Sequence, residues 1–211
     1  MSISTEAVFL KDYQPSDFLI DETILNFQLA ETATTVNARL MMRRNPAGKP
    51  DAELVLDGSG LDTRRLLLNG KVLAASEYKI TDAKLHIFVP LPEKFELESI
   101  VSIKPHLNTA LEGLYKSRSM FCTQCEAEGF RRITWYLDRP DLMSLFTVTV
   151  LGEEKRYPVL LSNGNLAESG KLNNGMHWAT WKDPFKKPCY LFALVAGDLK
   201  FVEDFFITMS G

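Results

Sequence analysis

The segment 123–140 concentrates side chains that could bind or brace a ligand. It reads TQCEAEGFRRITWYLDRP, a mixture of acidic, basic, amide and aromatic residues with no strand or helix period. A core strand does not need that mixture. Arginine beside an acidic, proline-bounded turn can form bidentate ion pairs. We therefore predict that Arg131, Arg132 and Asp138 brace a loop carrying the polar side chains Gln124 and Glu126.

Cys122 and Cys125 form a C-x-x-C spacing, which is found in zinc sites and in thioredoxin-like redox sites. A zinc site would need a second cysteine pair or histidines at ligand spacing, and neither follows. A redox dithiol would need a helix N-terminus to lower its pKa, and the flanking residues predict no helix. His86, His106 and His177 are far apart in the sequence, so we expect no metal site in this chain.

Short strands separated by tight turns are predicted to position these side chains. Leu66–Leu68, the turn Asn69-Gly70 and Val72-Leu73 have the pattern of a β-hairpin, because Asn-Gly accepts the positive φ angles of primed turns. Residues 85–89 alternate apolar and other side chains, as expected for a strand with one buried face. The β-branched run 100–103 predicts another strand, which ends before Pro105.

The second half repeats this pattern. Strands are predicted at 146–151, 157–161 and 176–181, with Asn-Gly turns at 163–164 and 174–175. The apolar run 189–196 is predicted to be a strand buried on both faces. Asp138 could cap a short helical turn that continues through 142–146. These features predict an all-β fold, an antiparallel sandwich or saddle with few helical turns.

Composition narrows the function classes. The 211 residues suffice for one large or two small domains, and the formal charge of −3 argues against a nucleic-acid-binding surface. No apolar run approaches the roughly 18 residues of a membrane span, and no secretory signal begins the chain. Three cysteines fit a reducing compartment, so a cytoplasmic location is expected, with no nucleic-acid or membrane partner.

Three ordered blocks resemble the N-terminal domain of bacterial zinc aminopeptidases of the aminopeptidase N type, in the gluzincin family. The blocks are Thr109–Tyr115, Thr123–Pro140 and Tyr190–Asp198, the last preceded by Asp183-Pro184-Phe185. Residues before about Asn108 match only as generic β structure. The resemblance implies a metallopeptidase that removes single residues from peptide N-termini. Its zinc-binding H-E-x-x-H motif and its Gly-Ala-Met-Glu-Asn motif do not occur in this chain.

The resemblance also implies roles for individual residues. Glu126 matches the acidic residue that holds the α-ammonium group of the substrate, and Gln124 matches a position lining the pocket for the first side chain. A carboxylate suits the first role because charge-assisted hydrogen bonds are strong. An amide suits the second because it donates and accepts without fixed charge. Zinc and the catalytic residues would lie in another part of the parent enzyme, and the partners would be peptides with a free N-terminus.

The same resemblance predicts a β domain over residues 1–198 and the start of a catalytic domain over 199–211, where an apolar segment around Phe205 and Phe206 suggests an interrupted strand. The fragment alone is expected to be inactive. An alternative is a free-standing β-sandwich that binds a sugar or peptide on Trp178 and Trp181. A redox protein using Cys122 and Cys125 is a third possibility.

Overall fold

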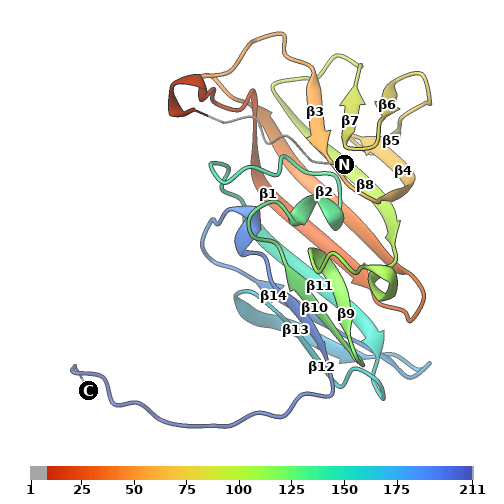
Figure 1. The fold of residues 1–211 in the computed structure, drawn as a ribbon, viewed down its shortest axis with the longest axis vertical. Coiled ribbons are helices and arrows are strands. Elements are labelled where there is room, and N and C mark those ends of the chain that lie inside the picture. The colour runs from red at the N-terminus through yellow and green to blue at the C-terminus, as the bar shows by residue number, and fades with distance from the viewer. Residues whose placement is uncertain (1–8, 211) are drawn as a thin grey trace.

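A computed structural model describes residues 9–210. Strands dominate it, as predicted, and the only helical elements in this range are four short 3-10 turns (Figure 1). These turns are η1 (Leu10–Asp12), η2 (Pro105–Leu107), η3 (Phe130–Arg132) and η4 (Cys189–Leu191). The strands belong to three sheets of eight, four and three strands.

The eight-stranded sheet has the order β13-β14-β11-β1-β2-β8-β4-β5. Its strands are β1 (Phe18–Gln28), β2 (Thr34–Arg44), β4 (Asp62–Leu68), β5 (Lys71–Val72), β8 (Lys94–Ile103), β11 (Leu145–Glu153), β13 (Asn165–Lys171) and β14 (Met176–Lys182). All neighbours are antiparallel except β1 and β11, which run parallel. One pair of strands in this sheet is thus parallel, whereas the sequence predicted antiparallel pairing throughout.

β1 and β2 form the centre of this sheet. Alternate residues of β2 are buried, as period-2 side-chain alternation requires. In β1 the alternation shifts between Ile20 and Glu22, where a bulge interrupts the register with β2. The bulge keeps Phe18 and Ile20, and then Thr23, Leu25 and Phe27, on the buried face.

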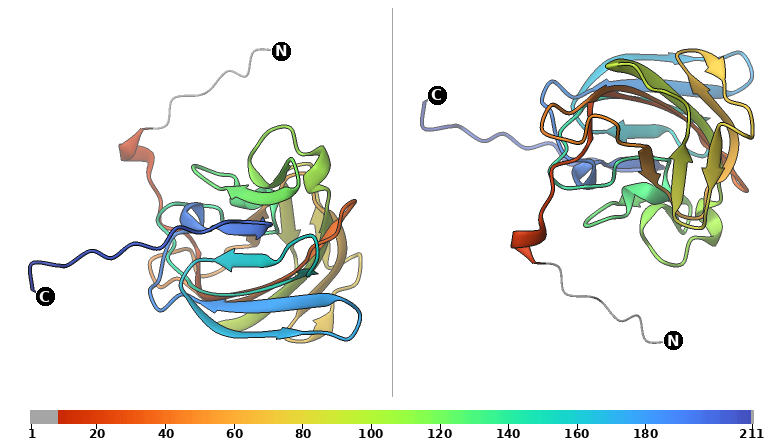
Figure 2. Two further views of the ribbon diagram at one scale, coloured as in Figure 1. Left: turned by 90° about the horizontal axis from the view of Figure 1, so that it is seen from below. Right: turned by 90° about the horizontal axis from the view of Figure 1, so that it is seen from above.

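Two smaller sheets cover one face of the large sheet (Figure 2). One has the order β12-β15-β10-β9, with β9 (Gly113–Ser117), β10 (Met120–Gln124), β12 (Val159–Ser162) and β15 (Leu194–Gly197). The other has the order β3-β7-β6, with β3 (Leu54–Asp57), β6 (Tyr78–Ile80) and β7 (Lys84–Ile87). Packing between the large sheet and these two produces the predicted sandwich.

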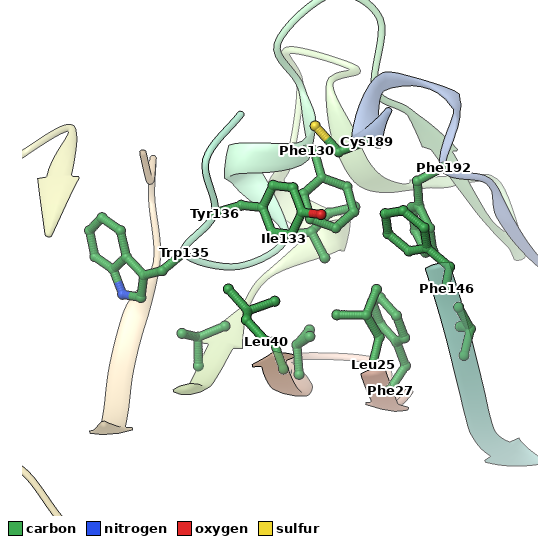
Figure 3. Close-up of a cluster of buried hydrophobic side chains, with 14 of the residues drawn as sticks. Leu25, Phe27, Leu40, Phe130, Ile133, Trp135, Tyr136, Phe146, Cys189 and Phe192 are labelled. Atoms are coloured by element: carbon green, nitrogen blue, oxygen red, sulfur yellow. The ribbon is translucent and has the colours of Figure 1, made fainter. Parts of the chain in front are cut away.

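Aromatic residues from the loop between β10 and β11 fill the centre of the core (Figure 3). Phe130, Trp135 and Tyr136 are each at most 2% exposed. Phe130 packs edge-on against Tyr136, with 4.6 Å between the ring centroids, and against Phe192 at 5.3 Å. The aromatics of segment 123–140 are therefore core residues, and they anchor the loop to the large sheet, where Phe130 contacts Phe146 and Tyr136 hydrogen-bonds to Thr23.

The Asn-Gly turns differ in what they connect. Asn69 and Gly70 take φ angles of 50° and 77° and join the hairpin strands β4 and β5, as predicted. Asn174-Gly175 joins β13 and β14, also as predicted. Asn163-Gly164, however, connects β12 to β13, which belong to different sheets. The same turn sequence therefore serves a crossover, and nothing in the dipeptide distinguishes the two uses.

Two local predictions were wrong. The residues after Asp138 form a turn at 140–141 and then β11, with no helix. The Asp138 side chain is buried and occupied by other donors, and alternating burial of Phe146, Val148 and Val150 fixes 145–153 as a strand. The run 189–196 is not one strand, because η4 follows Pro188 and only 194–197 pair as β15.

Residues 199–210 contain no helix or paired strand and extend away from the sheets in both views of Figure 2. Phe201, Phe205 and Phe206 in this segment are each at least 86% exposed. The boundary at 198 between a β domain and a catalytic domain stays a prediction. Over residues 9–210 no helix is long and apolar enough to cross a membrane.

Candidate functional site

The loop that leaves β10 presents the two predicted substrate-facing residues. Gln124 is the last residue of β10 and Glu126 lies in the following turn; both are exposed. The Gln124 Oε1 accepts a hydrogen bond from the Glu126 amide at 3.0 Å, and the Glu126–Ala127 peptide bond is cis. No residue in the range 9–210 donates to the Glu126 carboxylate, which therefore faces solvent and is available to a cationic ligand.

Two glycines allow this loop to pack closely on β9. A Cβ atom on Gly129 would lie 2.5 Å from the Gln124 carbonyl oxygen and 2.9 Å from the Gly113 amide nitrogen. Gly113 has a φ of 69°, and a Cβ there would meet Arg132 at 2.7 Å. The backbone of the loop thus contacts the start of β9 in a way that excludes side chains, which fixes where the Glu126 turn lies.

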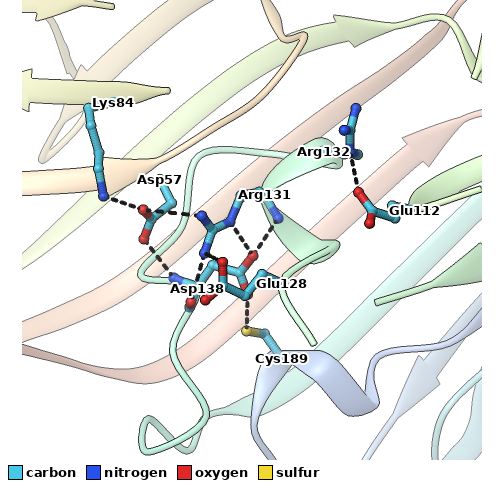
Figure 4. Close-up of polar contacts among 8 residues, drawn as sticks. All are labelled: Asp57, Lys84, Glu112, Glu128, Arg131, Arg132, Asp138 and Cys189. Atoms are coloured by element: carbon cyan, nitrogen blue, oxygen red, sulfur yellow. Dashed lines mark hydrogen bonds and ion pairs between the residues drawn. The ribbon is translucent and has the colours of Figure 1, made fainter. Parts of the chain in front are cut away.

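Arg131 and Asp138 join two parts of the loop between β10 and β11 (Figure 4). The Asp138 carboxylate has no exposed surface, and one of its oxygens accepts hydrogen bonds from Arg131 N at 3.0 Å and Arg131 Nε at 2.9 Å. Its other oxygen accepts from the Cys189 thiol at 3.1 Å. Arg131 Nη2 also contacts Glu128, at 2.9 Å, inside the exposed turn. A buried carboxylate and an arginine therefore connect the core to the turn that carries Glu126.

Asp57, at the end of β3, extends this network to the three-stranded sheet. Its Oδ2 accepts from the Asp138 amide at 3.2 Å, and its Oδ1 lies 2.5 Å from Lys84 Nζ and 3.9 Å from Arg131 Nη1. The backbones of Asp57 and Tyr136 exchange hydrogen bonds at 2.7 and 3.0 Å. Neither Asp57 nor Lys84 was predicted, since 81 residues separate Asp57 from Asp138.

Arg132 is not part of that network. It pairs with Glu112 at 3.0 Å, and the two side chains are 35% and 52% exposed. This ion pair ties η3 to the residue before Gly113. The two adjacent arginines thus hold the loop from opposite sides, one through a buried carboxylate and one through an exposed pair.

Burial and charge shift the pKa values of the groups around Asp138. Burial lowers the pKa of Arg131, but the hydrogen bond to Asp138 and the charges of Asp57 and Glu128 outweigh it and raise the pKa overall. Burial raises the pKa of Cys125 to about 12, and burial together with Asp138 raises that of Cys189. A reactive thiol needs the opposite shift. The C-x-x-C spacing thus contains one buried, protonated thiol and one partly exposed thiol, Cys122, whose pKa is also raised by burial.

A hollow of about 640 Å³ lies beside this network, and Asp57, Lys84, Glu128, Arg131 and Asp138 are among the residues lining it. Charged residues of both signs line it. Within residues 9–210 no group of three or more His, Cys, Asp or Glu side chains is arranged to hold a metal ion. The described residues therefore line this hollow with charged groups of both signs, but they offer no ligand set for zinc.

Comparison with known families decides the classification. The model of the peptidase M1 N-terminal domain matches residues 12–191. This chain belongs to the peptidase M1 N-terminal domain family. The match includes the loop with Gln124 and Glu126, its brace and all but the last strand of the sandwich.

Curated relatives carry this M1 N-terminal domain as part of a longer chain. The chain is 50% identical to Aminopeptidase N of Caulobacter vibrioides over 98% of its length, and 46% identical to Aminopeptidase N of Escherichia coli over all of it. It spans only 23% and 24% of those two proteins. The matched relatives are thus about four times as long as this chain.

Solved structures have the same M1 N-terminal architecture. Legionella pneumophila aminopeptidase A, in complex with aspartic acid, superposes with a TM-score of 0.86 at 36% identity, over 90% of this chain and 22% of that one. A Deinococcus radiodurans M1 zinc metallopeptidase bound to a Tyr-Ser-Ala substrate superposes with a TM-score of 0.74 over 86% of this chain and 42% of that one. At 19% identity the second comparison supports the fold alone.

The two tryptophans of the alternative, a free-standing binding module, do not share a surface. Trp178 and Trp181 are three residues apart in β14, so they lie on opposite faces of the large sheet. Trp181 packs against the core and donates to the Leu160 carbonyl at 3.1 Å. Trp178 lies on the other face, above Gly170. A stacking platform made of both side chains is therefore absent from this M1 N-terminal domain.

Proposed function

We propose that this chain is the substrate-anchoring domain of a zinc aminopeptidase that releases N-terminal amino acids from peptides. The observation that carries the proposal is the Glu126 carboxylate, which is exposed and unpaired on a loop that the Gln124 side chain and the contacts of Arg131 hold in place. Family membership supports it, because relatives named Aminopeptidase N contain this domain.

Glu126 would hold the α-ammonium group of the substrate. A carboxylate accepts charge-assisted hydrogen bonds from an ammonium group, and these are about twice as strong as neutral ones. A fixed anion at the end of a cleft also sets the register, so that one residue fits before the scissile bond. Gln124 would line the pocket for that residue with its Nε2, since its Oε1 is occupied by the Glu126 amide.

Hydrolysis itself would depend on residues outside this chain. Zinc, bound by the catalytic domain of the parent protein, would polarise the scissile carbonyl and activate water. The residues described here would bind and orient the peptide. The isolated chain is accordingly expected to be inactive, and a cytoplasmic location and the lack of nucleic-acid or membrane partners stay predictions.

The outer face of the four-stranded sheet has features expected of a surface that another domain of the parent enzyme covers. The register places Tyr115, Cys122, Val195 and Leu161 in one cross-strand row on the face opposite to the core. Gln124 lies on the same face of β10, two residues after Cys122. An apolar row continuous with the substrate-facing residue fits a surface on which the catalytic domain rests.

Replacing Glu126 in the full-length enzyme tests the proposal. Glu126→Gln keeps the shape and removes the charge, so kcat/KM for an alanine anilide should fall about 10- to 150-fold, the value of one charged hydrogen bond. Glu168→Gln, an exposed carboxylate on the edge strand β13, is the matched control and should have no effect. An unchanged kcat/KM for Glu126→Gln would refute the assignment, as would clear turnover by the isolated chain with added zinc.

A further inference from the structure

Asp57 lies between the three-stranded sheet and the loop that carries Glu126. It ends β3, its backbone pairs with that of Tyr136, and its side chain contacts Lys84, Arg131 and the Asp138 amide. It is nearly buried, with 12% of the side chain exposed, and it does not touch Glu126. A carboxylate with this many partners is more than a solvated turn residue.

The guanidinium of Arg131 connects Asp57 with the exposed turn that carries Glu126. Its three nitrogens contact three acidic residues: Nε faces the Asp138 carboxylate, Nη1 faces Asp57, and Nη2 faces Glu128 and the Asp138 carbonyl oxygen. Because the guanidinium is planar and rigid, a shift of one nitrogen moves the other two with it. Glu128 is two residues after Glu126 in the same turn, so such a shift would be transmitted to the turn.

We propose that Asp57 is a positioning residue for Glu126, acting through Arg131. The inference rests on the proposed function, in which Glu126 binds the substrate amine. The carboxylate of Glu126 has no partner of its own among residues 9–210, so its position depends on the backbone of its turn. That backbone is held by the Gln124 side chain, by the close contact of Gly129 with Gly113, and by Glu128 on Arg131. The three-stranded sheet thereby acts as a support for the substrate-binding loop.

A double-mutant cycle in the full-length enzyme tests this role. Asp57→Asn keeps an oxygen for the Asp138 amide but removes the charge that faces Lys84 and Arg131. We expect KM for an alanine anilide to rise about 10-fold, the low end of the effect known for residues that hydrogen-bond to the ligands of metal sites. In the Glu126→Gln background the same substitution should have no further effect, because the carboxylate it positions is gone.

A merely structural role would give the opposite pattern, with Asp57→Asn costing the same factor in both backgrounds. That result would overturn the proposal, and so would an unchanged KM for Asp57→Asn alone. Glu96→Gln is the matched control, since Glu96 pairs with Arg39 at 2.6 Å on the opposite face of the large sheet. It should leave KM unchanged.

A second variant covers the case in which Asp57→Asn does not fold. Arg131→Lys keeps the charge but cannot contact Asp57, Asp138 and Glu128 together, so it should raise KM with the same dependence on Glu126. If Arg131→Lys raises KM by the same factor with and without the Glu126 carboxylate, the proposed connection through Arg131 is wrong. If Glu126→Gln alone leaves kcat/KM unchanged, the proposed function fails. If Glu126→Gln acts but Asp57 and Arg131 do not couple to it, only the positioning role fails.

Discussion

Replacing Arg131 and Arg132 separately by methionine should have very different effects on stability, although the two arginines are neighbours in η3. Arg131→Met leaves the Asp138 carboxylate, which is fully buried, with only the Arg131 amide and the Cys189 thiol as donors. Removing one partner of a buried ion pair costs about 3–5 kcal/mol, because an uncompensated charge stays in the core. Arg132→Met breaks an exposed pair with Glu112, which is worth about 0–1 kcal/mol.

Urea unfolding of the 211-residue chain, followed by the fluorescence of its three tryptophans, measures both free energies of unfolding. Trp135 lies in the braced loop and is 2% exposed, so its emission reports on this region. A third variant, Arg131→Met with Asp138→Asn, should regain much of the loss, since a neutral amide can be buried with fewer donors. Equal costs for the two single variants, or no recovery in the double variant, would refute the account of the brace.

Three further predictions concern turns and thiols. Gly70→Ala should lower the free energy of unfolding by about 1 kcal/mol, because alanine at a φ of 77° is strained but its Cβ has open space. Gly164→Ala should lower it by more, because the added Cβ would lie 2.3 Å from the Lys182 carbonyl oxygen. Equal losses in urea unfolding would contradict this. Iodoacetamide at pH 8 should modify Cys122 well before Cys125 and Cys189, and mass spectrometry of the peptides would show the order. Because folding raises the pKa of Cys125 from 9.0 to about 12, its contribution to stability is present below pH 9 and should be lost as the pH rises from 9 to 12. A Cys125→Ala variant should lack that part of the alkaline decline.

Local patterns predicted much of the fold. The hairpin at Asn69-Gly70 and the strands around 85–89 and 100–103 follow from turn chemistry and period-2 alternation, which act over a few residues. The resemblance, in contrast, covered mainly the region after Asn108 and left the first strands generic. β1 and β2 are the longest strands and lie at the centre of the large sheet. The bulge after Ile20 breaks the simple alternation in β1, which weakens the pattern that would have predicted it.

The site could be predicted only in part. Arg131 and Asp138 are seven residues apart, close enough for a loop-bracing pair to be expected from the sequence. Asp57 and Lys84 approach Arg131 and Asp138 from the three-stranded sheet, and Cys189 approaches from η4, so these contacts depend on how distant parts of the chain pack. The parallel pairing of β1 with β11 is also a long-range contact, since these strands are far apart in the chain. Such contacts have no signal in a single sequence.

Discrimination between a free and a missing amine tests the central claim most directly. The measurement is the ratio of inhibition constants for Ala-Ala-Ala and its desamino analogue, in the full-length wild-type enzyme and in Glu126→Gln. If the carboxylate of this domain binds the α-ammonium group, the wild type should prefer the free amine, and Glu126→Gln should reduce that preference by about 10- to 150-fold. An equal preference in both enzymes would contradict the claim that Glu126 anchors the substrate.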